Sequence, residues 1–354
     1  MPDAKLQTAV LGLGPQGLAL LQAADQVEHL QICAVADRDT SLAEKTAAQY
    51  KCRAFDDYRQ LIIQNQLDCL LVAAPLHTCD EHVRQAMKKK FNVLKLPPLA
   101  RSFEEAAALV RLAEEQAVRF AVANTRRFAG SFLALREYLQ AGRLESVFLV
   151  SVFCGIGDEP VVAWQSDPKL AGGGVLLRNC CEMLDLVLWN FALPQQVYAI
   201  TTSQAQDKQQ RLYVTEDTAL VTMRFTDTLV ANLLASRRAV IGPNCELLKL
   251  YCRDRILTVD DESFTIEDSS GIDRQEHRAT TAVDLLRQSL ENFALSILAP
   301  DQHKLSGSAK ENLRTMAVIE SAYLSARTGT PEEPAKVLQM AQVEPIPISD
   351  ASHP

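Results

Sequence analysis

Short apolar runs alternate with longer amphipathic segments through the first third of the chain. The runs that are apolar enough to be strands buried on both faces cover residues 8–12, 32–36, 69–74, 92–96 and 119–123. Two segments between them, 41–50 and 102–116, have the apolar spacing of amphipathic helices. Strands that alternate with helices in this way predict βαβ units around a parallel sheet, as in an α/β domain of the Rossmann type.

Beyond residue 124 the pattern changes and strands dominate. Segments with strand patterning cover residues 147–153, 196–203, 218–225, 228–236, 246–252 and 255–259. One helix is expected at 175–190, and two more, at 282–298 and 304–328, follow the strands. The second half is therefore predicted to be an α+β domain with a large, mainly antiparallel sheet.

These patterns divide the chain into three predicted parts. They are a Rossmann domain at 1–124, an α+β domain at 125–330, and an extended C-terminal arm at 331–354. A chain of 354 residues is longer than one hydrophobic core usually organises, which fits two domains. The arm is expected because the tail is rich in proline and acidic residues.

A glycine-rich turn follows the first predicted strand and opens a helix. Gly12, Gly14 and Gly17 have the spacing of the dinucleotide-binding fingerprint, with Pro15 and Gln16 between the last two. The first glycine permits the tight turn, the second lets the backbone approach a pyrophosphate, and the third allows the helix to pack on the strand. The helix N-terminus then faces the negative charge of the phosphates.

The second predicted strand leads into Asp37, and Arg38 follows it. A carboxylate at this point accepts hydrogen bonds from the ribose hydroxyls and repels a 2′-phosphate, so it favours NAD over NADP. Arg38 weakens that preference, because an arginine here can hold the phosphate of NADP or lie over the adenine, although it can equally be a surface cation. The loop and the acid together predict a nucleotide site, with NAD as the expected cofactor and NADP as the alternative.

Further motifs accompany the glycine loop. They are Ala36-Asp37-Arg38, Ala73-Ala74-Pro75, the segment 93–100, the segment 124–128, and Ala171-Gly172-Gly173-Gly174 before a helix that ends near Trp189. With the loop, they resemble the glucose-fructose oxidoreductase, inositol dehydrogenase and rhizopine-catabolism (Gfo/Idh/MocA) family over residues 6 to about 330. The resemblance implies a Rossmann domain joined to an open-faced antiparallel sheet, with Ala74, Pro75 and Lys95 beside a bound NAD(P). It also implies redox chemistry on a sugar-, cyclitol- or imine-like substrate, and a homodimer or homotetramer formed through the sheet.

The positions where that family carries its proton-handling side chains hold other residues in this chain. The resemblance aligns Pro97 with the usual lysine, Arg178 with the usual aspartate and Glu182 with the usual histidine. Two hypotheses follow from this departure. The protein is an oxidoreductase with a reorganised proton relay, or it is a catalytically inactive dinucleotide-binding sensor or regulatory subunit of the same fold.

Three side chains are candidates for a substitute relay. Lys95 lies two residues before the missing lysine, so on an extended strand it points to the same face, displaced by roughly 6.5 Å; it can also be a simple strand-end cation. Glu182 is a candidate general acid or base, but Arg178, one helical turn earlier, can form a salt bridge with it. His77, in a loop expected near the nicotinamide, can act as a relocated acid or be an ordinary loop histidine.

Several side chains are candidate walls of a substrate pocket. They are Arg126, Trp164, Arg178 and Glu182. The fork of donors on Arg178 suits a substrate carboxylate. Arg126, with its neighbour Arg127, and Trp164 can equally serve packing or domain contacts.

Composition limits the partners and the compartment. The formal net charge of −8 disfavours nucleic acid and anionic membranes, and no apolar run is long enough to span a bilayer. Cys79, Cys154, Cys180 and Cys181 raise the hypothesis of a metal site, but none is expected, since free cysteines commonly pack as small hydrophobes. We expect a cytoplasmic protein that acts on a small molecule, with its nine cysteines as free thiols.

Overall fold

The computed structural model describes residues 5–143, 147–157, 162–203, 215–237, 239, 242–277 and 280–341. The chain forms two compact units. The first consists of residues 1–100, 105–125 and 280–312, and the second of residues 101–104, 126–279 and 313–354. Each unit is built around its own sheet.

The first unit contains a six-stranded parallel sheet in the order β3-β2-β1-β4-β5-β6. Its strands are β1 (Leu6–Leu11), β2 (Leu30–Ala36), β3 (Arg53–Phe55), β4 (Cys69–Val72), β5 (Asn92–Lys95) and β6 (Phe120–Val122). The helices are α1 (Pro15–Asp25), α2 (Thr40–Tyr50), α3 (Tyr58–Gln64), α4 (Leu76–Lys88), α5 (Phe103–Gln116, from residue 105 onward in this unit) and α10 (Ala282–Leu298). This strand order is that of a Rossmann fold, so the predicted α/β class is confirmed.

The register of the sheet brings the predicted site residues to one edge. Leu11 pairs with Ala36 on one side and with Val72 on the other, and Val72 pairs with Lys95. The residues that follow these strands therefore leave the sheet together at its carboxyl edge, where Rossmann folds bind their ligands. β3 was not predicted, because it is three residues long and only Phe55 is buried.

Helix α10 packs on α1 and belongs to the first unit. Its buried Leu290 and Phe293 share a core with Leu20 and Leu21 of α1. The sequence boundaries group this helix with the second domain, because the pattern gives the helix but not the sheet on which it packs.

The second unit contains an eight-stranded mixed sheet in the order β14-β13-β12-β11-β7-β10-β9-β8. The strands are β7 (Val147–Gly155), β8 (Gln196–Thr202), β9 (Thr218–Arg224), β10 (Val230–Ser236), β11 (Cys245–Cys252), β12 (Arg255–Val259), β13 (Ser263–Asp268) and β14 (Gly271–Glu276). All neighbours are antiparallel except β7 and β10. The predicted α+β domain with a mainly antiparallel sheet is confirmed.

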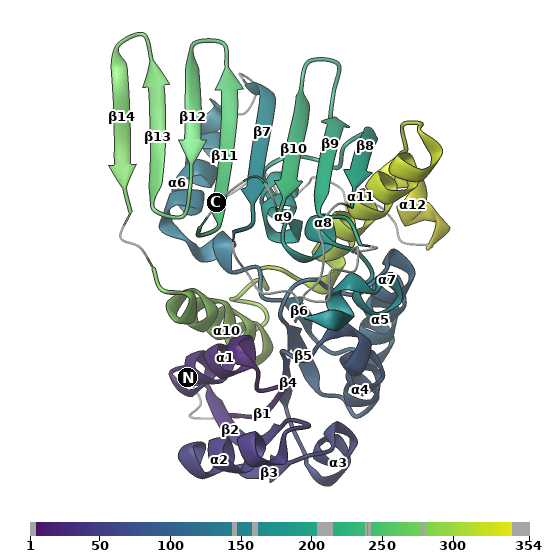
Figure 1. Ribbon diagram of the computed structural model, residues 1–354. Coiled ribbons are helices and arrows are strands. Elements are labelled where there is room, and N and C mark those ends of the chain that lie inside the picture. The colour runs from purple at the N-terminus through teal and green to yellow at the C-terminus, as the bar shows by residue number, and fades with distance from the viewer. Residues whose placement is uncertain are drawn as a thin grey trace. The chain divides into compact units, whose positions relative to one another are not determined.

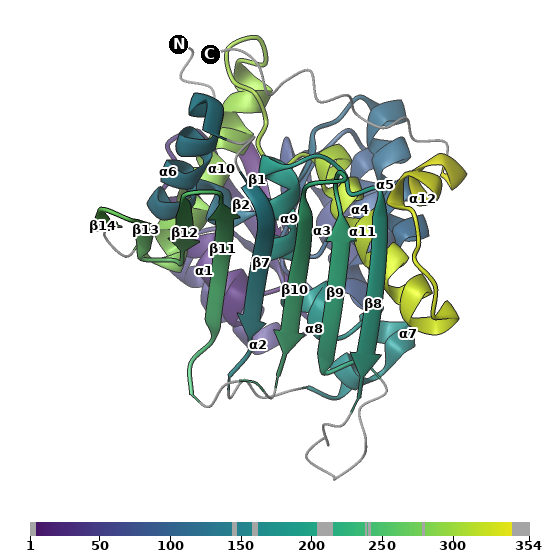
Figure 2. The same cartoon turned by 90° about the horizontal axis from the view of Figure 1, so that it is seen from above.

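Helices of the second unit lie along one face of its sheet (Figure 1). They include α6 (Gly130–Tyr138), α7 (Pro168–Ala171), α8 (Val175–Arg178), α9 (Cys181–Asn190), α11 (Ala309–Thr328) and α12 (Pro334–Met340). Figure 2 views the sheet from its other face, which the described helices of this unit leave uncovered. Side chains alternate accordingly, with Val197 and Val221 buried while Ile200 and Leu220 are about half exposed.

Three sequence expectations in this unit need correction. The single helix at 175–190 is two helices, because the amides of Asn179 and Cys180 both bond to the carbonyl of Val175 and end α8. The helix expected from residue 304 begins at Ala309. The tail is not wholly an extended arm, since Pro334 starts helix α12 and apolar side chains of that helix are buried; residues 342–354 lie outside the described residues.

Two strands at one edge of this sheet were not predicted. Strands β13 and β14 were missed, and every residue of β14 is exposed, so the sheet edge lacks apolar alternation.

Within the described ranges, no helix is long and apolar enough to cross a membrane.

Candidate active site

The glycine loop of the first unit is built by close backbone approach. Gly12 has a φ of 91°, and a Cβ there would lie 2.6 Å from the backbone nitrogen of Ala74. A Cβ on Gly17 would lie 1.9 Å from the carbonyl oxygen of Gly12. Only glycine fits at both positions, so the loop, helix α1 and the turn after β4 are held together.

Gly14 differs from the other two glycines. A Cβ on Gly14 would meet nothing within 4 Å, so this residue faces open space. It is the N-cap of α1, Pro15 is the first helical residue, and no side chain caps the helix. The first-turn amides of Gln16 and Gly17 have no partner within the helix and can bind an anion. The loop therefore fits a dinucleotide pyrophosphate.

Asp37 is fixed beside this loop. Its Oδ2 accepts a hydrogen bond of 2.6 Å from the amide of Leu13, and its Oδ1 accepts one of 3.0 Å from the amide of Asp39. Each carboxylate oxygen has a second lone pair, which can accept from a ribose hydroxyl. Arg38 is exposed. The structure thus brings together the acid and the glycine loop, as the sequence spacing predicts.

Pro75 and His77 open helix α4. Pro75 is the N-cap, and its carbonyl accepts bonds from the amide and hydroxyl of Thr78. His77 therefore lies in the first turn of a helix, and its expected loop placement is wrong. The reason is that Leu76 and Cys79 begin a buried helical face that continues to Met87.

Lys95 is the last residue of β5 and is only 2% exposed. Its ammonium donates a 2.8 Å hydrogen bond to the carbonyl of Leu99. The side chain thus holds the turn that contains Pro97. A cation buried at the carboxyl edge of the sheet is compatible with either a cofactor contact or a structural role.

Arg126 is surrounded by carboxylates in the second unit. It lies in the short helix η1 (Thr125–Phe128). Its Nη1 is 3.6 Å from Oε2 of Glu182, its Nε donates a 3.0 Å bond to Asp261, and its Nη2 is bonded to Glu246. Glu182 lies in the first turn of α9, where the helix dipole favours a negative charge. Two predicted substrate residues, Arg126 and Glu182, are therefore in contact.

The electrostatics of this cluster keep Arg126 charged. Burial alone would lower the pKa of its guanidinium, but the attraction of Glu246, Glu182 and Asp261 outweighs burial and raises the pKa above its usual range. The side chain of Glu246 is 7% exposed, whereas that of Glu182 is 20% exposed. Glu182 is the more accessible of these two carboxylates.

Two buried cysteines beside this cluster, Cys154 and Cys181, are protonated thiols. The Cys154 thiol donates a 3.1 Å hydrogen bond to Glu246. Its contact with the Cys180 thiol, together with burial, raises the pKa of Cys154 far above the usual range, and burial, with the charge of Glu182, does the same for Cys181. Protonated thiols are poor metal ligands and poor nucleophiles.

Arg178 lies on Trp164. Its guanidinium carbon is 5.3 Å from the centroid of the indole ring, a cation–π contact between α8 and the short helix η4 (Ala163–Ser166). The hypothesis that Arg178 and Glu182 are a turn apart on one helix is wrong, because α8 ends at Arg178 and Glu182 lies in the first turn of a second helix. Trp164 and Arg178, both predicted for the substrate pocket, are brought together.

Arg127 has a packing role. It forms two hydrogen bonds of 2.7 Å with the carboxylate of Asp185, and both side chains are at most 4% exposed. The guanidinium also lies 5.4 Å from the ring centroid of Trp189. This pair fixes η1 on α9, and so holds Arg126 near Glu182.

Sequence reasoning missed Glu246 and Asp261. Glu246 did carry a signal, since it shares strand parity with the buried Leu248 and Leu250. An acid on the core-facing side of a strand needs a cationic partner, and Arg126 supplies it. Asp261 follows β12 in an exposed turn and had no such signal.

The strand order and the glycine loop define a dinucleotide-binding Rossmann domain, and comparison with known proteins gives the family. Residues 6–124 match the family described as "Oxidoreductase family, NAD-binding Rossmann fold", and residues 132–252 match the "GFO/IDH/MocA C-terminal domain". The chain belongs to the Gfo/Idh/MocA family.

Known relatives have diverged in sequence. A UDP-N-acetylglucosamine 3-dehydrogenase of Acidithiobacillus ferrooxidans is 26% identical over 72% of this chain and 74% of its own. D-xylose 1-dehydrogenase (NADP(+)) 2 of Haloferax volcanii is 24% identical over 92% and 98%. A levoglucosan dehydrogenase, solved with NADH and levoglucosan, superposes with a TM-score of 0.84 at 16% identity, covering 93% of this chain and 99% of that one.

Proposed function

We propose that the protein is an NAD-dependent oxidoreductase that acts on a small polar substrate of the sugar, cyclitol or imine type. The observation that carries the proposal is the glycine loop, where Gly14 borders open space and Asp37 is fixed beside it by Leu13. The relatives support the substrate class, because their names include a nucleotide-sugar dehydrogenase and a xylose dehydrogenase.

The cofactor site draws on the carboxyl edge of the parallel sheet. The residues proposed to hold the cofactor are Gly12, Gly14, Pro15, Gln16, Gly17, Asp37, Arg38, Ala74, Pro75 and Lys95. A bound nicotinamide would supply the hydride chemistry, and the chain would position it. Asp37 favours NAD over NADP because its carboxylate can accept from a ribose hydroxyl and repels a phosphate.

The substrate side draws on Arg126, Trp164, Arg178 and Glu182. Glu182 is the proposed general acid or base of this set, and its Oε2 lies 3.6 Å from Nη1 of Arg126. Arg178 offers several donors to substrate oxygens. Lys95 and His77 are the relay candidates that we propose within the first unit.

Binding and turnover test this proposal separately. Calorimetry of the purified chain should detect NAD and NADH, with weaker binding of NADPH. A panel of sugars, cyclitols and imines should then yield NADH production or consumption. The variant Glu182→Gln should lower kcat about 100-fold, as expected for loss of an acid–base group, whereas Glu267→Gln, at an exposed position of strand β13, should not. Undiminished activity after joint replacement of Glu182, Lys95 and His77 would refute the relay.

A second candidate function is a catalytically inactive dinucleotide-binding sensor or regulatory subunit. Two contacts favour it: the Lys95 ammonium is engaged by the carbonyl of Leu99, and Glu182 is engaged by Arg126. This function predicts NAD binding without turnover of any compound in the panel.

We also propose a homo-oligomer formed through the uncovered face of the eight-stranded sheet. Phe148, Ile200 and Leu220 are 47%, 52% and 49% exposed on this sheet, and apolar surface of this kind is typical of an interface. Light scattering should show a dimer or tetramer that dissociates in the double variant Ile200→Lys, Leu220→Lys. The matched control is Ile63→Lys, since Ile63 is 59% exposed on α3 of the first unit. An unchanged mass in the double variant would contradict this interface.

A further inference from the structure

The N-terminus of helix α8 is held by one residue from a distant part of the chain. Glu216, just before β9, accepts hydrogen bonds from the amides of Gly174 (2.7 Å) and Leu176 (3.0 Å) through its carboxylate. Its main-chain carbonyl accepts a third bond, of 3.0 Å, from the amide of Val175. Three consecutive amides of the α8 N-terminus are therefore bound to Glu216.

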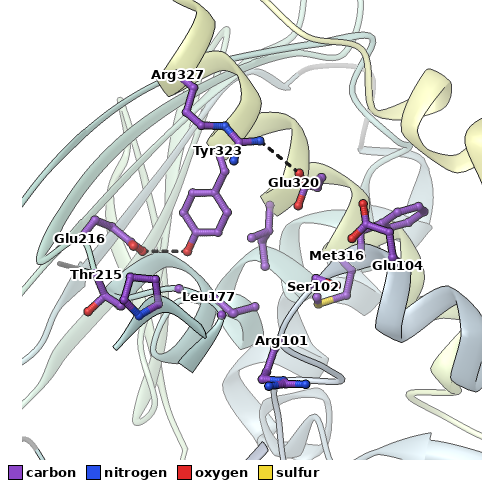
Figure 3. Close-up of a pocket in the computed structure, with 15 residues that line it drawn as sticks. Arg101, Ser102, Glu104, Leu177, Thr215, Glu216, Met316, Glu320, Tyr323 and Arg327 are labelled. Carbon is purple, nitrogen blue, oxygen red and sulfur yellow. Dashed lines mark hydrogen bonds and ion pairs between the residues drawn. The ribbon is translucent and has the colours of Figure 1, made fainter. Parts of the chain in front are cut away.

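Tyr323 completes this arrangement from helix α11. Its hydroxyl donates a 2.8 Å hydrogen bond to Oε1 of Glu216, as Figure 3 shows. The burial of that hydroxyl, together with the charge of Glu216, raises the pKa of Tyr323 well above its usual value, so the phenol remains a donor. Burial likewise raises the pKa of Glu216, although the hydrogen bonds from Tyr323 and from α8 oppose this rise.

The glycines before α8 are required by the same contacts. A Cβ on Gly173 would lie 2.1 Å from the hydroxyl oxygen of Tyr323. A Cβ on Gly174 would lie 1.9 Å from the carbonyl oxygen of Glu216. The glycine run that precedes α8 thus serves the approach of Tyr323 and Glu216.

Tyr323, Glu216 and Leu177 of α8 line a cavity of about 600 Å³ (Figure 3). Its other walls include Met316 and Ile319 of α11. The apolar side chains of α8, from Val175 to Leu177, are at most 1% exposed, so packing and the hydrogen bonds to Glu216 together fix this helix.

Helix α8 carries a candidate substrate residue at its far end. Arg178 is the last residue of α8 and stacks on Trp164, and Glu182 lies in the first turn of the next helix. The amide of Arg178 donates a 2.9 Å hydrogen bond to the carbonyl of Gly174, so a shift at Gly174 reaches Arg178. The position of Arg178 therefore depends on the contacts of Glu216.

We propose that Glu216 and Tyr323 are positioning residues that set the place of Arg178 and Trp164 for substrate binding. The part that concerns substrate rests on the proposed function. The positional part does not, because it concerns only α8 and the residues that hold it.

Hydrogen exchange and fluorescence test the positional part on the full chain without any substrate. Tyr323→Phe and Glu216→Gln should each speed exchange of the amides at 174–178, roughly tenfold or more, as expected when a charge-assisted hydrogen bond is lost. Trp164 is one of two tryptophans, so in a Trp189→Phe background its quenching by acrylamide should rise. Unchanged exchange and quenching in Tyr323→Phe would overturn the proposal.

Matched controls separate position from general loosening. Tyr198→Phe removes an exposed hydroxyl from β8, and Glu320→Gln neutralises another carboxylate of the same cavity; neither should change exchange at 174–178. Gly173→Ala should also speed that exchange, because its Cβ would lie 2.1 Å from the hydroxyl oxygen of Tyr323 and displace it. Unchanged exchange at 174–178 in Gly173→Ala would count against the role of Tyr323.

Kinetics then test the substrate part. If the enzyme turns over a substrate, Tyr323→Phe should raise KM several-fold with kcat little changed, because binding and not chemistry is affected. A fall in kcat at constant KM would overturn the role in substrate binding. Absence of turnover in the wild type would refute the proposed function and leave the exchange and quenching results in force.

Discussion

The glycine loop of the first unit and the segment of α8 and α9 in the second unit are suited to ligands by different means. At the loop, Gly12 and Gly17 are pressed against backbone atoms, and amides are the groups available to a ligand. At α8 and α9 the available groups are side chains, namely Arg178 on Trp164 and Glu182 beside Arg126. A site made of backbone amides keeps its binding groups when neighbouring side chains are replaced. A site made of side chains loses or changes a binding group with each replacement.

We propose that the departures from the family pattern, at Pro97, Arg178 and Glu182, change side-chain chemistry and leave the glycine loop unchanged. Gly12 and Gly17 are required by backbone contacts within the fold, whereas Gly14 faces open space. Cofactor binding and proton transfer can therefore diverge independently within one family.

The largest effect is expected at the buried ion pair of Arg127 and Asp185, which holds α9. Asp185→Asn leaves the guanidinium of Arg127 without its counter-charge in a site where both side chains are at most 4% exposed. We expect a loss of about 3–5 kcal/mol in the free energy of unfolding. Chemical denaturation measures it, with Glu114→Gln as the control, since the pair of Glu114 with Lys310 is exposed and should cost under about 1 kcal/mol. Equal losses of unfolding free energy in Asp185→Asn and Glu114→Gln would mean that α9 does not depend on the pair of Arg127 and Asp185.

The glycine loop allows a sharper comparison between two neighbouring positions. Gly17→Ala inserts a Cβ 1.9 Å from the carbonyl of Gly12 and should cost about 1–3 kcal/mol of stability, besides weakening NAD binding. Gly14→Ala meets no protein atom within 4 Å and should leave stability unchanged while it weakens NAD binding. Thermal melting and calorimetry separate the two. A stability loss at Gly14 as large as at Gly17 would show that the space beside Gly14 is not kept for a ligand.

The difference between local backbone patterns and contacts from distant parts of the chain also decides which elements could be predicted from the sequence. The parallel sheet was predictable because its strands are apolar on both faces, and α10 matched its expected bounds. Its packing on α1 was not predictable, since a helical pattern does not name the sheet that it covers. The break between α8 and α9 was missed because no glycine or proline marks Asn179 and Cys180.

The candidate site shows the same limit at the level of side chains. Gly12, Gly17 and Asp37 were found because their spacing is imposed by local backbone geometry. Glu216 and Tyr323 contact α8 from positions far along the chain, and their spacing carries no motif. Contacts of this kind depend on how strands and helices associate, which a one-dimensional pattern does not contain.

A smaller effect is expected at the acid beside the loop. Asp37→Ser should weaken NAD binding about tenfold, because one charge-assisted hydrogen bond to a ribose hydroxyl is lost. The affinity for NADP should fall less or rise, since the charge that repels its phosphate is removed. Calorimetry with both dinucleotides measures the ratio. Asp39→Ser is the control, because serine can keep the N-cap that Asp39 gives α2; an equal change there would remove the specific role of Asp37.

The smallest effect is expected at Glu320, a partly buried acid of the second unit. Burial, together with the nearby charge of Glu104, raises the pKa of Glu320 above its ordinary value of 4.5. A carboxyl group whose pKa is raised in the folded state makes its full contribution to stability below the unfolded-state pKa. That contribution is lost as the pH rises through the folded-state pKa. Glu320→Gln should therefore raise Tm at pH 7, by under about 2 °C, and should have no such benefit below pH 4.

The control for this change is Glu115→Gln, an exposed acid on α5 whose replacement should alter Tm equally at both pH values. Melting curves of both variants across this pH range test the sign directly. If Glu320→Gln lowered Tm at neutral pH, the ion pair of Glu320 with Arg327, 3.7 Å apart, would outweigh the cost of burial. The cavity wall would then be held by charge pairing, as α9 is by Arg127 and Asp185, and the dependence of the second unit on side-chain charges would extend to α11.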